Sequence, residues 1–223
     1  MNQAPILEST TESTRIIAIR HGETAWNVAT RIQGSLDIKL NERGHEQAKA
    51  AAEALRGADI AAIYSSDLWR AHDTAMAIAD VAGIRTIPTE GLRERLFGIF
   101  EGKTFAEIGE LWPDQAELWR KRDPNFCPEG GESLITFRER ILHCVSRIAA
   151  KHAGQQIVIV SHGGVNDILY RAATGLDLQA PRTWSLGNAE INRLLWTPQG
   201  FTLVGWSDTA HLQGKVLDEI NNR

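Results

Sequence analysis

The chain has 223 residues, with 24 lysines and arginines against 28 acidic residues, a formal charge of −4 and a hydrophobic fraction of 43%. It is long enough for one large domain or two small ones, and its ordinary composition excludes disordered, collagen-like and coiled-coil chains. The slightly acidic balance, without a block of lysine and arginine, argues against nucleic acid as a partner.

In chain order, short β-branched runs alternate with longer helical patterns. The predicted elements are strand 15–19, helix 41–56, strand 60–65, helix 68–82, strand 85–87, helices 104–112 and 114–121, helix 132–152, strand 156–160, helix 165–174 and strands 190–197 and 201–207. Asn41 is a plausible N-cap, and Gly83 and Gly175 end their helices. This alternation predicts an α/β fold with a mostly parallel sheet.

Three other features bear on where the protein acts. No segment approaches the roughly 20 apolar residues of a membrane span, so no membrane partner is expected. The first residues carry no secretory signal and predict a flexible tail at 1–14, ahead of a single domain at 15–223. Cys127 and Cys144 lack metal-type or redox-type spacing and favour a reducing compartment, which predicts a cytoplasmic protein.

Three of the predicted strands end at unusual polar residues. The first ends at Arg20-His21-Gly22, the fourth at Ser161-His162-Gly163-Gly164, and the second is followed within one turn by Arg70. Ligands in open α/β sheets bind beyond the carboxyl ends of the strands, so these residues are expected to meet in one crevice. Two histidines, two arginine forks and free N–H groups at a helix start suit a small anion such as phosphate.

The remaining histidines on predicted helices show no such pattern. His45, His72, His143 and His152 lack partner spacing, and we assign them no catalytic role. The chain also contains no HExxH, CxxC or carboxylate cluster. The sequence therefore predicts no metal site and no cofactor.

With further runs included, the chain resembles the histidine phosphatase superfamily, the group that contains cofactor-dependent phosphoglycerate mutase. The runs that carry the resemblance are RHGET at 20–24, WN at 26–27, LNERG at 40–44, SSDLWRA at 65–71, LRERLFG at 92–98, EG at 101–102 and SHGG at 161–164. They occur in the expected order across about residues 15–212. The resemblance implies a three-layer α/β/α sandwich and a phosphorylated nucleophile at His21.

The residue types fit that implied chemistry. A neutral imidazole attacks phosphorus only if one ring nitrogen is free, which requires an acceptor for the N–H of the other nitrogen. Resemblance then implies that Arg20, Arg70 and His162 clamp the phosphoryl oxygens, where charge develops during transfer. Such a clamp needs no metal ion.

A carboxylic acid is needed to protonate the leaving alkoxide. By resemblance this acid is Glu94, and its apolar neighbours Leu92 and Leu96 would help it to hold a proton near neutrality. From the residues alone, the simpler interpretation of Glu94 is a surface side chain in an Arg-Glu-Arg run. Glu101 is the next candidate for the proton donor. Glu23 is expected to be structural, tying its loop through hydrogen bonds.

Secondary contacts to the substrate are also predicted. Asn27, Gln33 and Gly34 align with family positions that line the phosphate pocket, and Gly163 lies at the anion-facing helix start. Asn188 is expected to support the pocket through its amide. For Gln33 and Asn188, a polar loop residue without a role is an equally good interpretation.

The superfamily divides between mutases and phosphatases. Mutases carry a longer insertion between the acid and the second histidine, whereas Glu94 and His162 are only 68 positions apart. The preferred prediction is therefore a phosphomonoesterase acting on a small phosphorylated metabolite, with specificity set by residues 105–126. The alternatives are a cofactor-dependent mutase, a non-catalytic phospho-ligand binder and a nucleotide-binding domain. The last is disfavoured because the sequence contains no glycine-rich nucleotide-binding loop. Both a monomer and a homodimer are compatible with the sequence.

Overall fold

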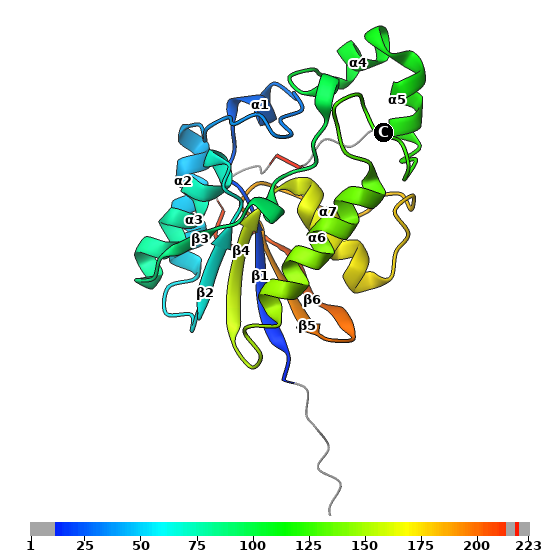
Figure 1. Cartoon of the computed structure of the whole chain (residues 1–223). Helices are drawn as coiled ribbons and strands as arrows, with labels where there is room; N and C mark the ends of the chain where they lie inside the picture. The colour runs from blue at the N-terminus through cyan, green and yellow to red at the C-terminus, as the bar shows by residue number, and fades with distance from the viewer. Residues whose placement is uncertain (1–11, 213–216, 219–223) are drawn as a thin grey trace, which may run out of the picture.

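Residues 12–212 and 217–218 are described by the computed structural model, and they build one six-stranded sheet covered by helices (Figure 1). The strand order is β3-β2-β4-β1-β5-β6. The strands are β1 (Thr14–Arg20), β2 (Ala62–Ser65), β3 (Thr86–Pro88), β4 (Gln156–Ser161), β5 (Ile191–Thr197) and β6 (Gly200–Asp208). The first four are parallel and the last two add an antiparallel hairpin, which confirms the mostly parallel α/β sheet.

Helices connect the parallel strands. They are α1 (Ala25–Val28), α2 (Glu42–Ala54), α3 (Trp69–Ala82), α4 (Phe105–Leu111), α5 (Pro113–Arg120), α6 (Leu134–Ala149) and α7 (Gly163–Thr174). Asn41 caps α2 by accepting the N–H of Gly44 at 2.8 Å. Gly83 and Gly175 end α3 and α7 in the left-handed region, with φ of 70° and 69°, where glycine has no Cβ to clash.

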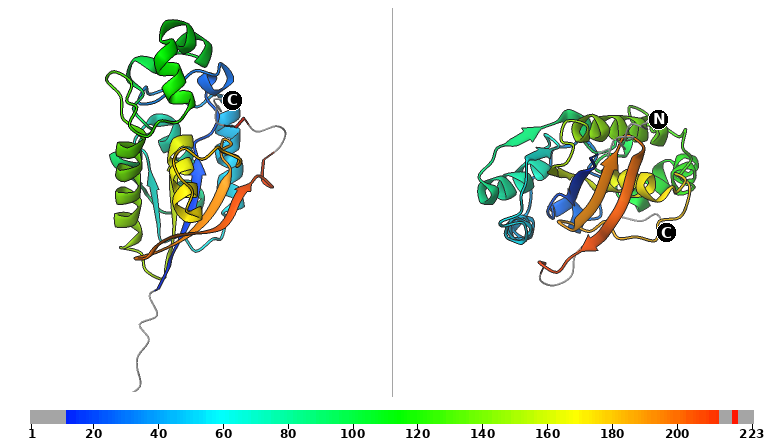
Figure 2. Two further views of the ribbon diagram at one scale, coloured as in Figure 1. Left: turned by 90° about the vertical axis from the view of Figure 1, so that its right-hand side faces the viewer. Right: turned by 90° about the horizontal axis from the view of Figure 1, so that it is seen from below.

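Two hydrophobic clusters define the layers of the sandwich. One joins β1, β2 and β4 to α2 and α3 through residues such as Ala52, Ala75 and Ile78. The other packs α6 and α7 on the opposite face through Ile141 and Ile168. Figure 2 shows these helices on either side of the sheet, with α4 and α5 beyond its upper end. The predicted three-layer α/β/α sandwich is confirmed.

A third, smaller cluster lies beneath α4 and α5. It consists of buried Ile32, Phe100, Ile108 and Ala116, with aromatic side chains around them. Phe100 is fully buried, and its ring stacks on that of Trp119 with centroids 5.1 Å apart. The α4–α5 segment therefore has apolar packing of its own, separate from the two sandwich clusters.

The predicted boundaries agree with these elements to within three residues at every end. Thr14 is already in β1, where its hydroxyl donates to Ala149 O at 2.8 Å, while residues 1–11 of the predicted tail lie outside the described residues. Helix α1 and two short 3-10 helices, Glu90–Leu92 and Gly98–Phe100, were not predicted. Within the described residues, the helices are too short or too polar to cross a bilayer.

Candidate active site

His21 directly follows β1 at the carboxyl edge of the sheet and is 3% exposed. Its backbone N–H donates to Ser161 O at 2.9 Å, which extends the β1–β4 ladder by one bond. Its Nδ1 lies 2.7 Å from Gly22 O, and because a carbonyl can only accept, Nδ1 carries the proton. This tautomer leaves a lone pair on Nε2, as nucleophilic attack by the imidazole requires.

His162 follows β4, and its ring centre lies 5.3 Å from that of His21 although the two are far apart in sequence. Arg70, in the first turn of α3, donates Nε–H to His162 Nδ1 at 3.2 Å. The proton of the neutral His162 ring is therefore on Nε2, which is buried and has no hydrogen-bond partner among the described residues. His162 itself is not among the residues that line the cavity around His21.

Burial is the main reason why the pKa values of both His21 and His162 lie well below the usual range for histidine. The positive charge of Arg70 and, more weakly, of Arg20 lowers them further. The hydrogen bond from His21 to the Gly22 carbonyl offsets only part of this effect on the pKa of His21. Both rings are therefore neutral at pH 7, so each keeps one unprotonated ring nitrogen.

The two arginines beside the histidines are held in place by backbone carbonyls. Arg20 is the last residue of β1, and its Nη1 donates to Leu186 O at 2.6 Å. Arg70 donates Nη1–H to Leu36 O at 2.8 Å and Nη2–H to Gly34 O at 2.7 Å. Both side chains are at most 1% exposed, so their charges cannot swing away from the site. The predicted convergence of the strand ends is confirmed.

Arg20, His21 and Arg70 line a cavity of about 560 Å³, whose aromatic wall includes Phe105 and Trp119. Eight basic and two acidic side chains from the described residues line it, so it attracts anions. The basic lining residues are Arg20, Arg31, Arg70, Arg95, Arg120, Lys121, Arg122 and Arg182.

Glu94 reaches the same cavity from the loop after Glu90–Leu92. Its Oε2 accepts the N–H of Gly164 at 2.9 Å, and its Oε1 accepts the N–H of Arg95 at 2.8 Å. Gly164 is in the first turn of α7, whose N-cap His162 provides no side-chain hydrogen bond. Glu94 thus satisfies an orphan N–H of α7 and is held within the cavity that contains His21.

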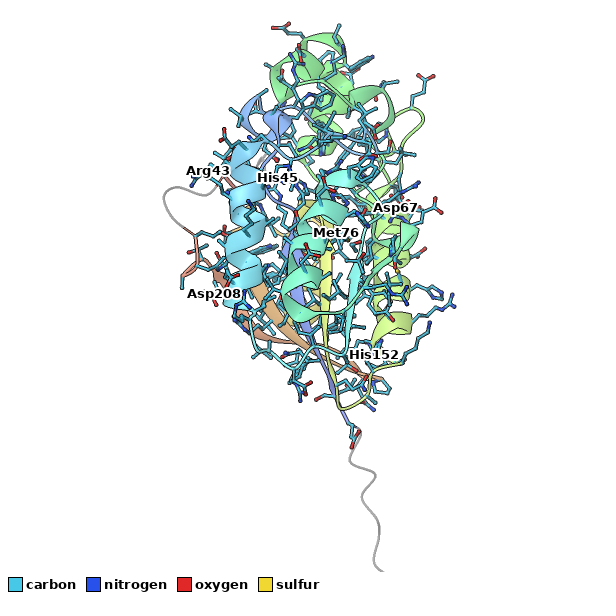
Figure 3. All side chains as sticks on the ribbon, turned by 90° about the vertical axis from the view of Figure 1, so that its left-hand side faces the viewer. Arg43, His45, Asp67, Met76, His152 and Asp208 are labelled. Atoms are coloured by element: carbon cyan, nitrogen blue, oxygen red, sulfur yellow. The ribbon has the colours of Figure 1, made fainter. Side chains whose placement is uncertain are left out.

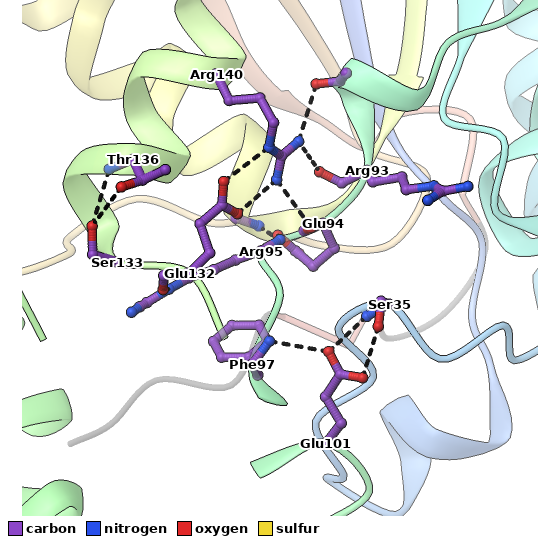
Figure 4. Close-up of polar contacts among 12 residues, drawn as sticks. Ser35, Arg93, Glu94, Arg95, Phe97, Glu101, Glu132, Ser133, Thr136 and Arg140 are labelled. Carbon is purple, nitrogen blue, oxygen red and sulfur yellow. Dashed lines mark hydrogen bonds and ion pairs between the residues drawn. The ribbon is translucent and has the colours of Figure 1, made fainter. Parts of the chain in front are cut away.

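The alternative acid, Glu101, has a different position. Its Oε1 accepts the N–H groups of Ser35 and Phe97 at 2.9 and 3.0 Å, and its Oε2 accepts the Ser35 hydroxyl at 2.8 Å (Figure 4). Glu101 is not among the residues that line the cavity. It holds the loop that carries Gly34, whose φ is 50°. Glu23 is confirmed as a loop tie, since its carboxylate accepts from the Asn41 amide at 2.8 Å.

The predicted secondary contacts divide into two groups. Asn27, Gln33 and Gly34 line the cavity, whereas Gly163 and Asn188 do not. Gly164 lines it in place of Gly163. The Asn188 amide donates to His21 O at 2.9 Å and so supports the backbone of His21.

Several cavity residues had no signal in the sequence. Arg31, Arg95, Arg122 and Arg182 are scattered along the chain, and only packing of the loops beyond the sheet brings them together. Arg95 is 3% exposed, and burial lowers its pKa to about 10. Of these four, only Arg122 had a local clue, since it belongs to the basic run at 120–122 within the segment expected to set specificity.

Other candidate chemistry lies away from this cavity. His152 precedes β4, at the end of the sheet opposite His21, and bonds the Tyr64 hydroxyl at 3.0 Å (Figure 3). His45 is exposed on α2. In the part of the chain that is described, no group of three or more histidine, cysteine, aspartate or glutamate side chains could hold a metal ion.

The fold and the site define a class of α/β proteins in which a buried histidine and buried arginines at the strand ends form an anion-attracting cavity. The family model of the histidine phosphatase superfamily (branch 1) matches residues 16–209. The chain belongs to this superfamily.

Similar proteins support the same class. The metal-independent phosphoserine phosphatase of Arabidopsis thaliana is 38% identical over 204 residues, covering 90% of this chain and 84% of the relative. The probable phosphoglycerate mutase GpmB of Yersinia pestis is 35% identical over 216 residues, covering 92% and 98%. A phosphoserine phosphatase variant from Entamoeba histolytica, solved with phosphoserine, is similar with a TM-score of 0.78 at 30% identity, covering 89% of this chain and 99% of that one. Together these similarities support a phosphoric monoester hydrolase.

Proposed function

We propose that the protein hydrolyses small phosphomonoesters in two steps, through a phosphohistidine on His21. The observation that carries this proposal is the neutral His21 ring, whose Nδ1–H is bound to Gly22 O and whose Nε2 is left with a lone pair beside two fixed arginines. The phosphatase relatives act on small phosphorylated substrates, which supports the same reaction class.

In the first step, the Nε2 lone pair of His21 attacks phosphorus and the ester P–O bond breaks. Arg20 and Arg70, with the Nε2–H of His162, stabilise the charge on the phosphoryl oxygens. Glu94 gives its proton to the leaving alkoxide, so that an alcohol departs. Nδ1 of His21 keeps its proton throughout, because its hydrogen bond to Gly22 O is made on the side away from the phosphoryl group.

In the second step, the Glu94 carboxylate takes a proton from water and the water oxygen attacks phosphorus. The P–Nε2 bond breaks and its electron pair returns to His21, which is again neutral. Inorganic phosphate leaves, and Glu94 is protonated for the next cycle. No metal or cofactor is used in these steps, since the two arginines neutralise the phosphoryl charge and the neutral His162 donates a hydrogen bond.

The cavity also supports a substrate with a substantial leaving group. Its volume of about 560 Å³ exceeds what a phosphate occupies, and basic and aromatic side chains line the space near α5. Residues 105–126 contribute Phe105, Trp119 and the basic run that follows it, which is consistent with specificity being set there.

The test uses purified protein and a panel of phosphate esters, with and without 2,3-bisphosphoglycerate. The proposal predicts release of inorganic phosphate, acid-labile labelling of the protein from a radiolabelled ester, and loss of both in His21→Ala. His45→Ala, which changes an exposed histidine on α2, is the matched control and should keep both. Isomerisation of phosphoglycerate without phosphate release would identify a mutase instead, as the name of the Yersinia relative suggests for that protein.

Three further expectations stay predictions. A cytoplasmic location rests on the two cysteines, which are both free thiols. A single domain at 15–223 predicts one cooperative thermal transition by calorimetry. Light scattering would distinguish a monomer from a homodimer.

A further inference from the structure

Arg140, on α6, is bound to the loop that carries Glu94 from the side away from the cavity. Its Nη1 donates to Gly91 O at 3.1 Å and to Arg93 O at 3.0 Å, and its Nη2 donates to Glu94 O at 3.2 Å (Figure 4). Arg140 is not among the residues that line the active-site cavity. It therefore contacts the backbone of the predicted acid and not the position of the substrate.

The remaining donors of Arg140 form a bidentate ion pair with the carboxylate of Glu132. Nε lies 2.9 Å from Oε1, and Nη2 lies 2.8 Å from Oε2. The side chains of Arg140 and Glu132 are 28% and 11% exposed, so solvent screens this pair only in part. All five N–H groups of the guanidinium are thus used, two on the carboxylate and three on carbonyls. A lysine has three donors and no planar fork, and it cannot replace this set.

The carboxyl group of Glu94 depends on that anchoring. Its two oxygens reach the N–H groups of Gly164 and Arg95, which come from different parts of the chain. If the loop at 91–94 shifts, the carboxyl cannot keep both contacts and also stay beside the phosphoryl site. A misplacement of about 1 Å at a catalytic group can cost on the order of 100-fold in rate.

We propose that Arg140 is a positioning residue that fixes Glu94 for proton transfer to the leaving alcohol. This inference rests on the proposed function, in which Glu94 is the acid. Arg140 also contributes, as the weakest of several causes, to the lowered pKa of His162. A charge-preserving change at Arg140 largely retains that influence, so it isolates the geometric role.

The test compares Arg140→Lys with wild type on two esters, glycerol 2-phosphate and p-nitrophenyl phosphate. The alkyl ester needs protonation of its leaving group, whereas p-nitrophenolate leaves without it. Arg140→Lys should lower kcat for the alkyl ester by about 10- to 100-fold and for the aryl ester by less than about 3-fold, with KM little changed. Arg147→Lys, which changes an exposed arginine two turns further along α6, is the matched control and should alter neither. Glu132→Gln, which keeps the shape of the partner, should act like Arg140→Lys but more weakly.

A double-mutant cycle with Glu94→Gln decides whether Arg140 acts through Glu94. In the Glu94→Gln background, Arg140→Lys should cause no further loss on the alkyl ester. Equal losses on both esters in Arg140→Lys, or losses that multiply in the double variant, would overturn this inference while leaving the phosphatase proposal intact. Equal losses on both esters in Glu94→Gln alone would remove the acid role of Glu94 and this inference with it.

Discussion

Gly164→Ala should impair proton donation by Glu94 without unfolding the protein. A Cβ at position 164 would lie 2.3 Å from Glu94 Oε1 and 3.2 Å from Phe137 Cε1, and contacts under 3.0 Å are essentially never seen for real Cβ atoms. The flexible carboxyl end of Glu94 must therefore move by at least about 0.7 Å, since the ring of Phe137 closes the neighbouring side. The carboxyl that should protonate the leaving group would no longer reach it in the same geometry.

The expected magnitude follows from that displacement. Since about 1 Å of misplacement can cost roughly 100-fold, kcat for an alkyl phosphate should fall by about 10- to 100-fold. The loss on p-nitrophenyl phosphate should stay below about 3-fold, because its leaving group needs no proton. Stability should change little, since Gly164 is in the first turn of α7 and the substitution strains one hydrogen bond, which contributes about 1 kcal/mol.

The assay measures kcat on both esters and the thermal midpoint of each variant. Gly109→Ala, at a helical glycine of α4 with open space around the added Cβ, is the matched control and should keep the wild-type ratio of alkyl to aryl rates. A Gly164→Ala enzyme with the wild-type ratio would refute the reasoning. A fall in the midpoint of more than about 5 °C would show that the substitution disturbs the fold instead.

The other predictions concern the nucleophile, metals and pH. His21→Ala should abolish turnover and phosphoenzyme labelling with a native circular dichroism spectrum, and a variant that kept activity would exclude His21 as the nucleophile. Activity should persist after exhaustive EDTA treatment, and a loss that a divalent ion reverses would contradict the mechanism. Because His21 and His162 are buried with lowered pKa values, the unfolded state binds more protons below about pH 6.5. The free energy of unfolding from urea titrations should therefore fall as the pH is lowered from 7.5 to 5.5. Each of the two histidines contributes a slope of up to about 1.4 kcal/mol per pH unit, so the fall should be less steep in His21→Asn.

The fold was largely predictable because its elements carry strong local signals. The apolar run before Arg20 is buried on both faces, as expected of a central parallel strand. Asn41 caps the start of α2 and Gly83 ends α3, both in the expected geometry. The long helix was predicted to begin at 132, whereas Ser133 is the N-cap and α6 begins at Leu134. Glu132 instead donates its N–H to Leu96 O, a contact between distant segments that no periodicity reveals.

The site was predictable only in part, for a related reason. His21 and His162 follow adjacent parallel strands, so the sheet itself determines that they meet. The outer wall depends on contacts between loops. Arg122, for example, faces the cavity because it pairs with Asp167 of α7 at 2.7 Å and donates to Leu178 O at 2.6 Å. Such pairs have no fixed sequence spacing.

The separate packing of the α4–α5 segment has a consequence for how the enzyme loses activity on gentle destabilisation. The small cluster around Phe100 and Ile108 shares no residue with the clusters that hold β1 and β4. Amide hydrogens in α4 and α5 can therefore exchange through local opening, while those of the β1–β4 ladder exchange only when the whole sheet unfolds. Mild denaturant should first weaken selection between large and small esters. The strand ends that carry His21 and His162 should stay assembled until global unfolding, so hydrolysis of a compact ester should persist after the selection between esters has been lost.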